Sequence, residues 1–397
     1  CEVPKRNLLT IAKPPFGVPV EDDQRSIREA ITKAIHKGKL STTLKPTDKV
    51  TIAVSDSTRP TPNSEILPIL LDELGKLGIR DKNVVVIIAT GMHNPDSPEE
   101  MRRNVGEEAL RRVKVVNHNP DDREHLVGVG RTELGTEMEV NKLFADADVR
   151  VTIGTIGPCM LAGWSGGGKT VIPGVSSRRS IDQNHRLFVR NVRKAKRGAM
   201  FGLIEGNWVR RDIDDYAQRA GVNLIVNTVQ NAKEEILGVY AGDLLEAYGR
   251  TLAHAKKAMT APVSEKADVV VVSPGVYSHE VSLYQSGSRM FASVEGIVER
   301  GGTIILVSSC YKGIYEGIER EEFKRALLQY RDPEEVLELT EKGKILSFES
   351  CISYQFVWMM KNFTTMVVTD GMSKKELEEI GMEHAPTISK ALETSLS

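Results

Sequence analysis

Cysteine is scarce in this sequence, and its few copies are widely separated. The four cysteines show no C-x-x-C spacing in a chain of 397 residues, so neither a disulfide framework nor a structural zinc site is expected. The sequence also lacks an apolar run of about 18–20 residues, the length that spans a bilayer, and its start shows no signal-peptide pattern. These absences predict a protein of the reducing cytoplasm without a membrane partner. The cysteines are Cys1, Cys159, Cys310 and Cys351.

An excess of either charge is absent as well. Lys and Arg number 53 and Asp and Glu number 54, so the formal net charge is −1. This balance provides no overall field that would attract nucleic acid or a membrane surface. Apolar residues make up 40% of the chain and charged residues 27%, which excludes disorder and is ordinary for a globular protein. The length favours two domains.

Short β-branched apolar runs alternate with amphipathic segments along the chain. Several runs, such as 84–88 and 269–272, are apolar on both faces, which is typical of parallel strands covered by helices on both sides. The alternation predicts two α/β domains with largely parallel sheets. Strands are expected at 49–55, 83–90, 113–117, 148–154, 223–229, 268–273, 302–308 and 364–369. Helices are expected at 22–37, 64–77, 97–112, 213–220, 244–259, 319–329 and 333–342.

A domain boundary is expected near residue 262. The polar, proline-containing segment 260–266 ends a long helical pattern, and a new apolar strand follows it. The chain is therefore expected to form an N-terminal catalytic and cofactor-binding domain at 1–262 and a smaller C-terminal domain at 263–384. A final helix at 385–397 could pack back on the N-terminal domain. We expect the active site in a cleft between the two domains.

A glycine-rich segment is the densest motif. The residues from Gly163 to Thr170 match G-x-x-x-x-G-K-T, the phosphate loop of NTPases. Such a loop needs an α-helix that starts at its Lys-Thr pair, but Pro173 and Gly174 follow closely and disfavour a helix there. Three interpretations remain: an NTPase, a flexible loop without a ligand, or a loop that approaches a ligand closely and presents Lys169 to it.

Side chains that can bind a ligand or transfer a proton directly follow two of the expected strands. Asp56 and Arg59 come after the strand at 49–55, and His93 comes after the strand at 83–90. Ligands of open α/β sheets bind beyond the carboxyl ends of the strands. At that edge Arg59 could bind a carboxylate or phosphate through two hydrogen bonds, and His93 could transfer a proton. Each segment could instead be an ordinary turn.

Four more residues are open to a functional and a structural interpretation. His185 follows Lys169 by 16 residues, but a lone histidine is more often a surface or core residue than a ligand. Tyr284 and Gln285 come shortly after a strand of the second domain and could form hydrogen bonds across a cleft. His118 also follows a strand and could serve as a base, although a turn residue outside the site explains it more simply.

The order and spacing of these motifs form a pattern of their own. They are Asp56-x-x-Arg59-Pro60, Gly91-x-His93-x-Pro95, Pro158-x-x-x-Ala162-Gly163-x-Ser165-Gly166-Gly167-x-Lys169, His185 and Leu283-Tyr284-Gln285. This pattern resembles the lactate racemase family of nickel-dependent 2-hydroxyacid racemases and epimerases. The resemblance extends from about residue 50 to about residue 290 and is much more specific than the phosphate-loop match inside it.

The resemblance implies a covalently held cofactor. In the family, the lysine at the position of Lys169 carries a nickel-pincer nucleotide through a thioamide, and the histidine at the position of His185 coordinates nickel. Neutral imidazole is a good nickel ligand. The implied partners are a small 2-hydroxyacid substrate and the cofactor-biosynthesis proteins needed for maturation. The implied cofactor-binding residues are Asp56, Ser57, Thr58, Ser165, Gly166, Gly167, Gly168 and Lys169.

The implied reaction moves a hydride from the alcohol carbon to the cofactor and returns it to the other face of a planar 2-oxoacid. Each enantiomer's hydroxyl must lose its proton to a base on its own side, so two acid/base groups are needed. In lactate racemases both are histidines. His93 matches the first, and Cys159 stands at the position of the second. Arg59, Tyr284 and Gln285 complete the implied catalytic set.

Two departures from the family pattern bear on the substrate. A free thiol has a pKa near 8.5 unless a positive neighbour lowers it, so Cys159 is either an assisted acid/base group or a small buried residue beside His93. Ser288 stands where many members carry a carboxylate-binding lysine, with Arg289 adjacent. These departures favour a 2-hydroxyacid other than lactate. They also leave open a homologue that binds the cofactor or a ligand without racemising.

Overall fold

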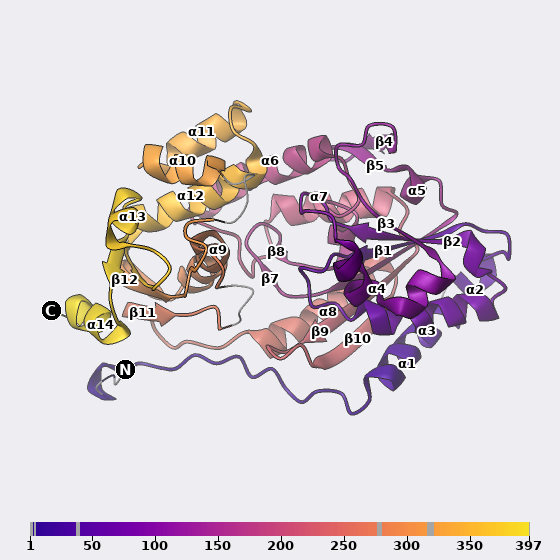
Figure 1. Cartoon of the computed structure of the whole chain (residues 1–397), viewed down its shortest axis with the longest axis horizontal. Helices are drawn as coiled ribbons and strands as arrows, with labels where there is room; N and C mark the ends of the chain where they lie inside the picture. The colour runs from indigo at the N-terminus through magenta and orange to yellow at the C-terminus, as the bar shows by residue number, and fades with distance from the viewer. Residues whose placement is uncertain (1–2, 4, 37–39, 276–279, 316–320, 397) are drawn as a thin grey trace.

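Two separate sheets organise the chain (Figure 1). The computed structural model describes residues 3, 5–36, 40–275, 280–315 and 321–396, so that Cys1 lies outside the described residues. The first sheet has the order β10 (Ile236–Gly242), β9 (Leu224–Gln230), β6 (Val149–Thr155), β1 (Val50–Ser55), β2 (Val84–Ala89) and β3 (Lys114–Asn117). The second has the order β11 (Ala267–Val272), β12 (Val298–Val307), β13 (Thr364–Val368) and β14 (Glu383–Ala385).

Parallel pairing dominates both sheets. Every neighbouring pair is parallel except β10 and β9, which confirms the α/β class with largely parallel sheets. All eight expected strands are present. The strands that the pattern missed are β10, β14, the hairpin of β4 (Leu126–Arg131) and β5 (Glu137–Asn141), and the short hairpin of β7 (Pro158–Cys159) and β8 (Gly163–Trp164). They are short, glycine-containing or exposed, so that they lack a continuous apolar run.

Helices connect the strands and cover the sheets. The expected ones are α1 (Asp23–His36), α3 (Asn63–Lys76), α4 (Pro98–Arg112), α7 (Trp208–Arg219), α8 (Leu244–Met259), α10 (Glu321–Gln329) and α11 (Pro333–Glu341). Residues 37 and 319–320 of the expected helices lie outside the described residues. The pattern missed α2 (Leu40–Thr43), α5 (Lys142–Ala145), α6 (Arg178–Ala195), α9 (Leu283–Val294), α12 (Ser347–Asn362) and α13 (Lys374–Glu379).

The first sheet is buried on both faces. In β1, Ile52 and Val54 pack in one apolar cluster with Ile27 of α1 and Ile66 of α3. Ala53, between them, points to the opposite face and belongs to a second cluster, which also contains Trp164, Ile213 of α7 and Ala247 of α8. Alternate residues of a strand face opposite sides of the sheet, so this strand carries buried apolar side chains on both faces. The glycine-rich segment lies on the face covered by α7 and α8.

Helix α6 joins the two sheet domains. Ser347, at the start of α12, donates from its backbone N–H to Asp182 Oδ1 of α6 at 2.9 Å. Arg193 of α6 forms ion pairs with Glu334 and Glu341 of α11. Helix α6 therefore packs against α7 and β5 as well as against α11 and α12 of the C-terminal part (Figure 1).

The final helix, α14 (Ile388–Leu396), packs on the C-terminal sheet. Its residues Ala391 and Leu392 are buried against Ile305 of β12 and Met366 of β13. The expectation that this helix could pack back on the N-terminal domain is therefore wrong, because the open face of the nearby sheet buries its apolar side chains. Among the helices that the structure describes, none combines the length and the apolar composition needed to cross a membrane.

Candidate active site

The strand order of the first sheet changes direction between β1 and β6. Strands β2 and β3 are added on one side of β1, whereas β6 and then β9 are added on the other side. The loops that follow the adjacent parallel strands β1 and β6 therefore diverge at their carboxyl ends. Such a switch point is where open α/β sheets bind ligands. Asp56 directly follows β1, and the glycine-rich segment follows β6.

Asp56 and His93 form a hydrogen-bonded pair across the loops after β1 and β2. The distance from His93 Nδ1 to Asp56 Oδ2 is 2.7 Å, and Asp56 is 3% exposed. Burial alone raises the pKa of Asp56, but the hydrogen bond and charge of His93, the charge of Arg59 and the Thr58 hydroxyl outweigh it and lower the pKa. Asp56 is thus a carboxylate that holds one ring nitrogen of His93 and orients the other.

The remaining polar residues of the β1 loop maintain the loop itself. Ser57 donates from its hydroxyl to Asp96 Oδ1 at 2.8 Å, and Thr58 donates from its backbone N–H and hydroxyl to Asp56. Asp96 is buried and also accepts from the amide of Asn104 at 2.9 Å. Arg59 is exposed, so that its guanidinium can reach a solute.

The loops after β2 and β6 are in contact. Gly91, just after β2, donates its backbone N–H to the carbonyl of Gly174 at 3.0 Å. A Cβ atom on Gly91 would lie 3.2 Å from Cβ of Pro173. The segment that carries His93 therefore packs directly on the turn that follows Lys169 and Thr170. Through this contact the structure brings the loop of His93 and that of Lys169 to the same edge of the sheet.

The glycine-rich segment does not have the structure of a phosphate loop. It forms the hairpin of β7 and β8 and then a 3-10 helix, η3 (Gly167–Thr170), which contains Lys169. The next α-helix, α6, begins only at Arg178. An NTPase loop places its phosphates at the N-terminus of a helix that starts at the Lys-Thr pair. The structure therefore does not support the NTPase interpretation.

The glycines of this segment pack against the protein. Gly166 and Gly167 have φ angles of 75° and 57°, in the left-handed region that favours glycine. A Cβ on Gly166 would lie 2.5 Å from Ile156 Cγ1, and one on Gly167 would lie 2.7 Å from the Tyr248 ring. The N–H of Gly167 donates to Asn227 Oδ1 at 2.9 Å. The glycine run thus allows the loop to pack tightly onto β9 and α8, which fixes the position of Lys169.

Alanine in place of Gly168 is expected to lower the free energy of unfolding by about 1–3 kcal/mol, the usual cost of overpacking. Its Cβ would lie 2.8 Å from both Ala217 Cβ and Ile213 O of α7. Gly249, inside α8, has open space around the same position, so Gly249→Ala is the matched control and should stabilise the helix by about 1 kcal/mol. Urea unfolding curves measure both, and equal effects of the two substitutions would contradict this packing.

Cys159 and Lys169 face one another across the hairpin. Lys169 Nζ donates to Cys159 Sγ at 3.4 Å, and both residues are half-buried. Burial alone raises the pKa of the thiol, but the Lys169 charge and the backbone N–H groups of Ala162 and Leu161 outweigh it and lower the pKa. The positive neighbour that a functional cysteine needs is therefore present.

His185 is a buried residue of α6 near Lys169. Its Nδ1 lies 2.8 Å from the carbonyl of Ile181, one turn earlier in the helix. Burial, followed by the positive charge of Lys169, lowers the pKa of His185 to about 4, so the imidazole is neutral at neutral pH. Donation from Nδ1–H to the carbonyl leaves the ring lone pair on Nε2, which is the arrangement of a metal-ligating histidine.

Tyr284 and Gln285 lie at the start of α9, which the sequence pattern did not identify as a helix. Tyr284 is 3% exposed and packs edge-on against Phe323 of α10, with ring centroids 5.0 Å apart. Its ring therefore belongs to the core of the C-terminal domain. Gln285 is half-buried and accepts at Oε1 from Arg289 Nη1 at 2.8 Å. Of the two residues, Gln285 has the side chain that can contact a solute.

Comparison with known proteins accounts for this combination of fold and site. Residues 1–197 match the model of the lactate racemase N-terminal domain, and residues 263–397 match that of the lactate racemase C-terminal domain. The chain belongs to the lactate racemase family. Racemases are isomerases, so the expectation of an isomerase of this family is confirmed.

Family members of known sequence and structure are similar over most of the chain. Lactate racemases of Thermoanaerobacterium thermosaccharolyticum and Lactiplantibacillus plantarum are 29% and 28% identical over 374 residues, which cover 94% of this chain and 85% of each relative. The structure of the former as apoprotein superposes with a TM-score of 0.87 at 25% identity, covering 100% of this chain and 91% of that one. A Thermotoga maritima protein shares the fold, with a TM-score of 0.71, 18% identity and coverage of 95% and 93%.

Residues that the sequence pattern did not indicate hold the glycine-rich segment in place. Arg210 of α7 is 1% exposed and donates to the carbonyl of Gly166 and to the Tyr248 hydroxyl, both at 3.2 Å. Its guanidinium also pairs with Asp214 and lies 4.4 Å from the centre of the Tyr248 ring. The i, i+4 spacing of Arg210 and Asp214 on a helix was a visible signal, but nothing local indicated that the pair would be buried.

Two features of this family member lie outside the site. His118 is buried, its Nε2 lies 2.9 Å from the carbonyl of Ser176, and burial lowers its pKa to about 4.

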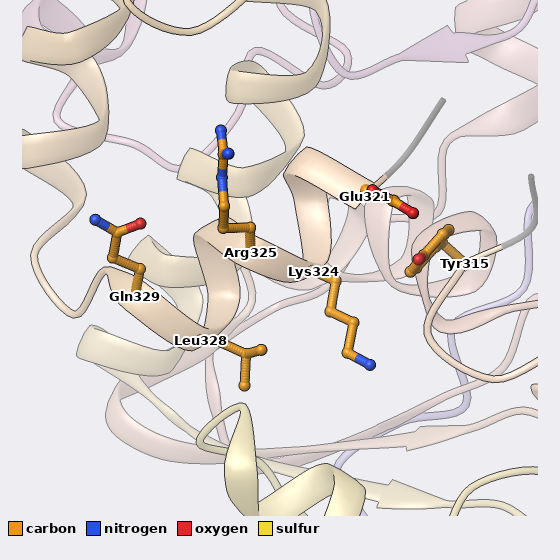
Figure 2. Close-up of a pocket in the computed structure, with 6 residues that line it drawn as sticks. All are labelled: Tyr315, Glu321, Lys324, Arg325, Leu328 and Gln329. Carbon is orange, nitrogen blue, oxygen red and sulfur yellow. The ribbon is translucent and has the colours of Figure 1, made fainter. Parts of the chain in front are cut away.

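A surface hollow of about 420 Å³ lies along α10, lined by Tyr315, Glu321, Lys324, Arg325, Leu328 and Gln329 (Figure 2). None of the site residues expected from the sequence lines this hollow.

Proposed function

We propose that this chain is a nickel-dependent racemase or epimerase of a 2-hydroxyacid other than lactate. The observation that carries the proposal is the grouping of a half-buried Lys169, a neutral buried His185 and Cys159 at one edge of the sheet. Family membership supports racemase chemistry in general. The non-lactate substrate is inferred from Cys159 and Ser288, which stand where lactate racemases carry histidine and often lysine.

The residues present fit a nickel-pincer nucleotide. Lys169 offers a primary amine on a loop that packing holds in place. His185 offers a neutral imidazole whose tautomer is set by Ile181 O. No group of three or more His, Cys, Asp or Glu side chains among the described residues is arranged to hold a metal. His185 would be a ligand that the protein supplies, and the nucleotide would supply others. Maturation would then require cofactor-biosynthesis proteins. We also propose that the enzyme is located in the cytoplasm.

In this proposal Lys169 tethers the nucleotide and His185 ligates its nickel. When bound, the nickel-pincer nucleotide supplies the hydride acceptor. His93 Nε2 accepts the hydroxyl proton of one enantiomer, because Asp56 holds Nδ1 and stabilises the imidazolium that forms. Arg59 binds the substrate carboxylate in two charge-assisted hydrogen bonds, and Gln285 supplies a further amide contact.

Cys159 acts as the second acid/base group. Its thiolate accepts the hydroxyl proton of the other enantiomer, and in the reverse direction its thiol donates a proton when that same enantiomer forms as the product. The backbone N–H groups of Ala162 and Leu161, which lower the pKa of the thiol and remain in place once Lys169 carries the cofactor, support this role. The same observation disfavours the alternative of a homologue that binds without racemising, because a space-filling cysteine requires no such stabilisation.

Replacing Cys159 by alanine is expected to lower the racemisation rate of the loaded enzyme by about 10²–10⁴-fold, the usual contribution of an acid/base group. Alanine removes the proton acceptor without adding volume. Cys351→Ala is the control, because Cys351 is buried and its pKa is raised by that burial. Polarimetry of both enantiomers measures the rates. Full activity of the Cys159 variant would contradict the acid/base role and leave His93 with another partner.

A panel of 2-hydroxyacids tests the function itself. Each acid carries deuterium at the reacting carbon and is incubated with protein produced together with the cofactor pathway. Chiral chromatography and mass spectrometry are expected to show stereochemical exchange with retention of the label for at least one acid. Absence of exchange for every acid by nickel-loaded protein would favour a non-racemising homologue.

A further inference from the structure

A nucleophilic thiol and a primary amine face one another in this chain before any cofactor is attached. Lys169 Nζ lies 3.4 Å from Cys159 Sγ, and both residues are partly exposed. We propose that the apoprotein takes acyl groups from small thioesters on Cys159 and passes them to Lys169. Lys169 is then an acyl-lysine modification site with a built-in acceptor.

Cys159 has the environment of a reactive cysteine. The ammonium of Lys169 and two backbone N–H groups stabilise its thiolate, and the thiolate is the nucleophilic form. Cys310 and Cys351 are fully buried, and burial raises the pKa of both. Among the cysteines that the structure describes, Cys159 is thus the one that is both accessible and activated.

The transfer balances without an oxidant. The Cys159 thiolate attacks the carbonyl carbon of the thioester, a new C–S bond forms, and the donor's thiolate leaves and takes up a proton from water. The ammonium of Lys169 loses one proton to water, and the neutral amine then attacks the carbonyl carbon held on Sγ. A C–N bond forms, the C–S bond to Cys159 breaks, and the proton of the amine passes to the departing thiolate or to water. The product is an amide on Nζ and a regenerated Cys159.

Geometry and charge both favour the second step. A separation of 3.4 Å between Nζ and Sγ leaves the amine within reach of a carbonyl carbon bonded to Sγ. Acylation of Sγ also converts the charged sulfur into a neutral thioester, which ends the ion pair that engages Nζ.

Acylation of Lys169 has a consequence for maturation. An amide nitrogen is no longer a nucleophile, so that a cofactor could not be attached to an acylated Lys169. This consequence rests on the proposed function, whereas the acyl transfer itself does not, because it needs neither nickel nor racemisation. The two ideas can therefore fail separately.

The test uses the full chain produced without the cofactor pathway and a small water-soluble acetyl thioester, S-acetyl-N-acetylcysteamine. Peptide mass spectrometry follows acetylation of Lys169 over time, with Lys374 and Lys375 as references. These two are exposed lysines of α13 whose ion-pair partners are Glu378 and Glu379. Acetylation of Lys169 is expected to be about 10-fold or more faster than that of the references, because an intramolecular transfer has a high effective concentration.

Two conservative variants separate the steps. Cys159→Ser should reduce acetylation of Lys169 to the rate of the reference lysines, whose own rates should not change. Lys169→Arg should retain the acetyl group on Cys159 as a hydroxylamine-labile thioester. Equal acetylation of Lys169 in wild type and Cys159→Ser would overturn the proposal, as would a wild-type protein that accumulates acetyl on sulfur while Lys169 stays unmodified.

Discussion

Alanine in place of His93 is expected to reduce the racemisation rate of the loaded enzyme by about 10²–10⁴-fold, the range for loss of a general acid/base. His93 lies on the loop after β2, and its Nδ1 is held by the buried carboxylate of Asp56 at 2.7 Å. The carboxylate fixes the ring and stabilises the imidazolium once Nε2 takes the proton. Binding of the substrate carboxylate by Arg59 should be preserved, so the loss should appear in kcat more than in KM.

Two further variants define what the His93 result means. Asp56→Asn keeps the shape of the pair but removes its charge, and it should lower kcat as well, because the imidazolium loses its partner. His118→Ala should lower kcat by no more than its loss of stability explains. His118 lies outside the site, where its ring bonds to Ser176 O. A His93→Ala enzyme with wild-type kcat would remove His93 from the mechanism and point to another base.

Replacing Lys169 by arginine is expected to abolish covalent cofactor attachment and to reduce racemisation to the background of the assay. Arginine retains the positive charge opposite Cys159 but is not a nucleophile at neutral pH, because its guanidinium stays protonated. Intact-mass measurement of protein produced together with the cofactor pathway should show the unmodified mass for this variant. Lys374→Arg, at an exposed lysine on α13, is the control and should be modified like wild type.

A modified and active Lys169→Arg protein would contradict the attachment site. The cofactor would then be held by another residue, and the glycine-rich segment would have a purely structural role. Nickel content alone does not distinguish these cases, because His185 could still bind metal weakly. The mass of the peptide that contains residue 169 decides between them.

The strands of this fold were predictable because burial on both faces produces short, continuous apolar runs in the sequence. Runs such as Val84–Ala89 are apolar at every position, and short continuous apolar runs of this kind are more typical of buried strands than of helices. Helix α6 was missed although its signals were present. Ser177 caps its N-terminus by accepting from Ser180 N, and Ile181, His185 and Phe188 recur at helical spacing on its buried face. The polar residues among them, His185 included, obscured the apolar stripe.

The candidate site was predictable in its residue types and less so in its contacts. Strand exits placed Asp56 and His93 at one edge, but only the fold shows that they are hydrogen-bonded. The glycine-rich motif was visible, whereas the reason for its glycines was not, since it depends on Tyr248 of α8 and Ala217 of α7, which are distant in sequence. Tyr284 had been assigned to a cleft because its phenol can donate, yet the partner of its ring, Phe323, lies in a helix much further along the chain.

One combined measurement tests the central claim most directly. Protein produced together with the cofactor pathway is divided between an intact-mass and peptide-mass analysis and a nickel assay. The account predicts a mass increase confined to the peptide that carries Lys169, together with about one nickel per chain, as expected for one metal held by one nucleotide and His185. An unmodified Lys169 in protein that had full access to the pathway would contradict the account.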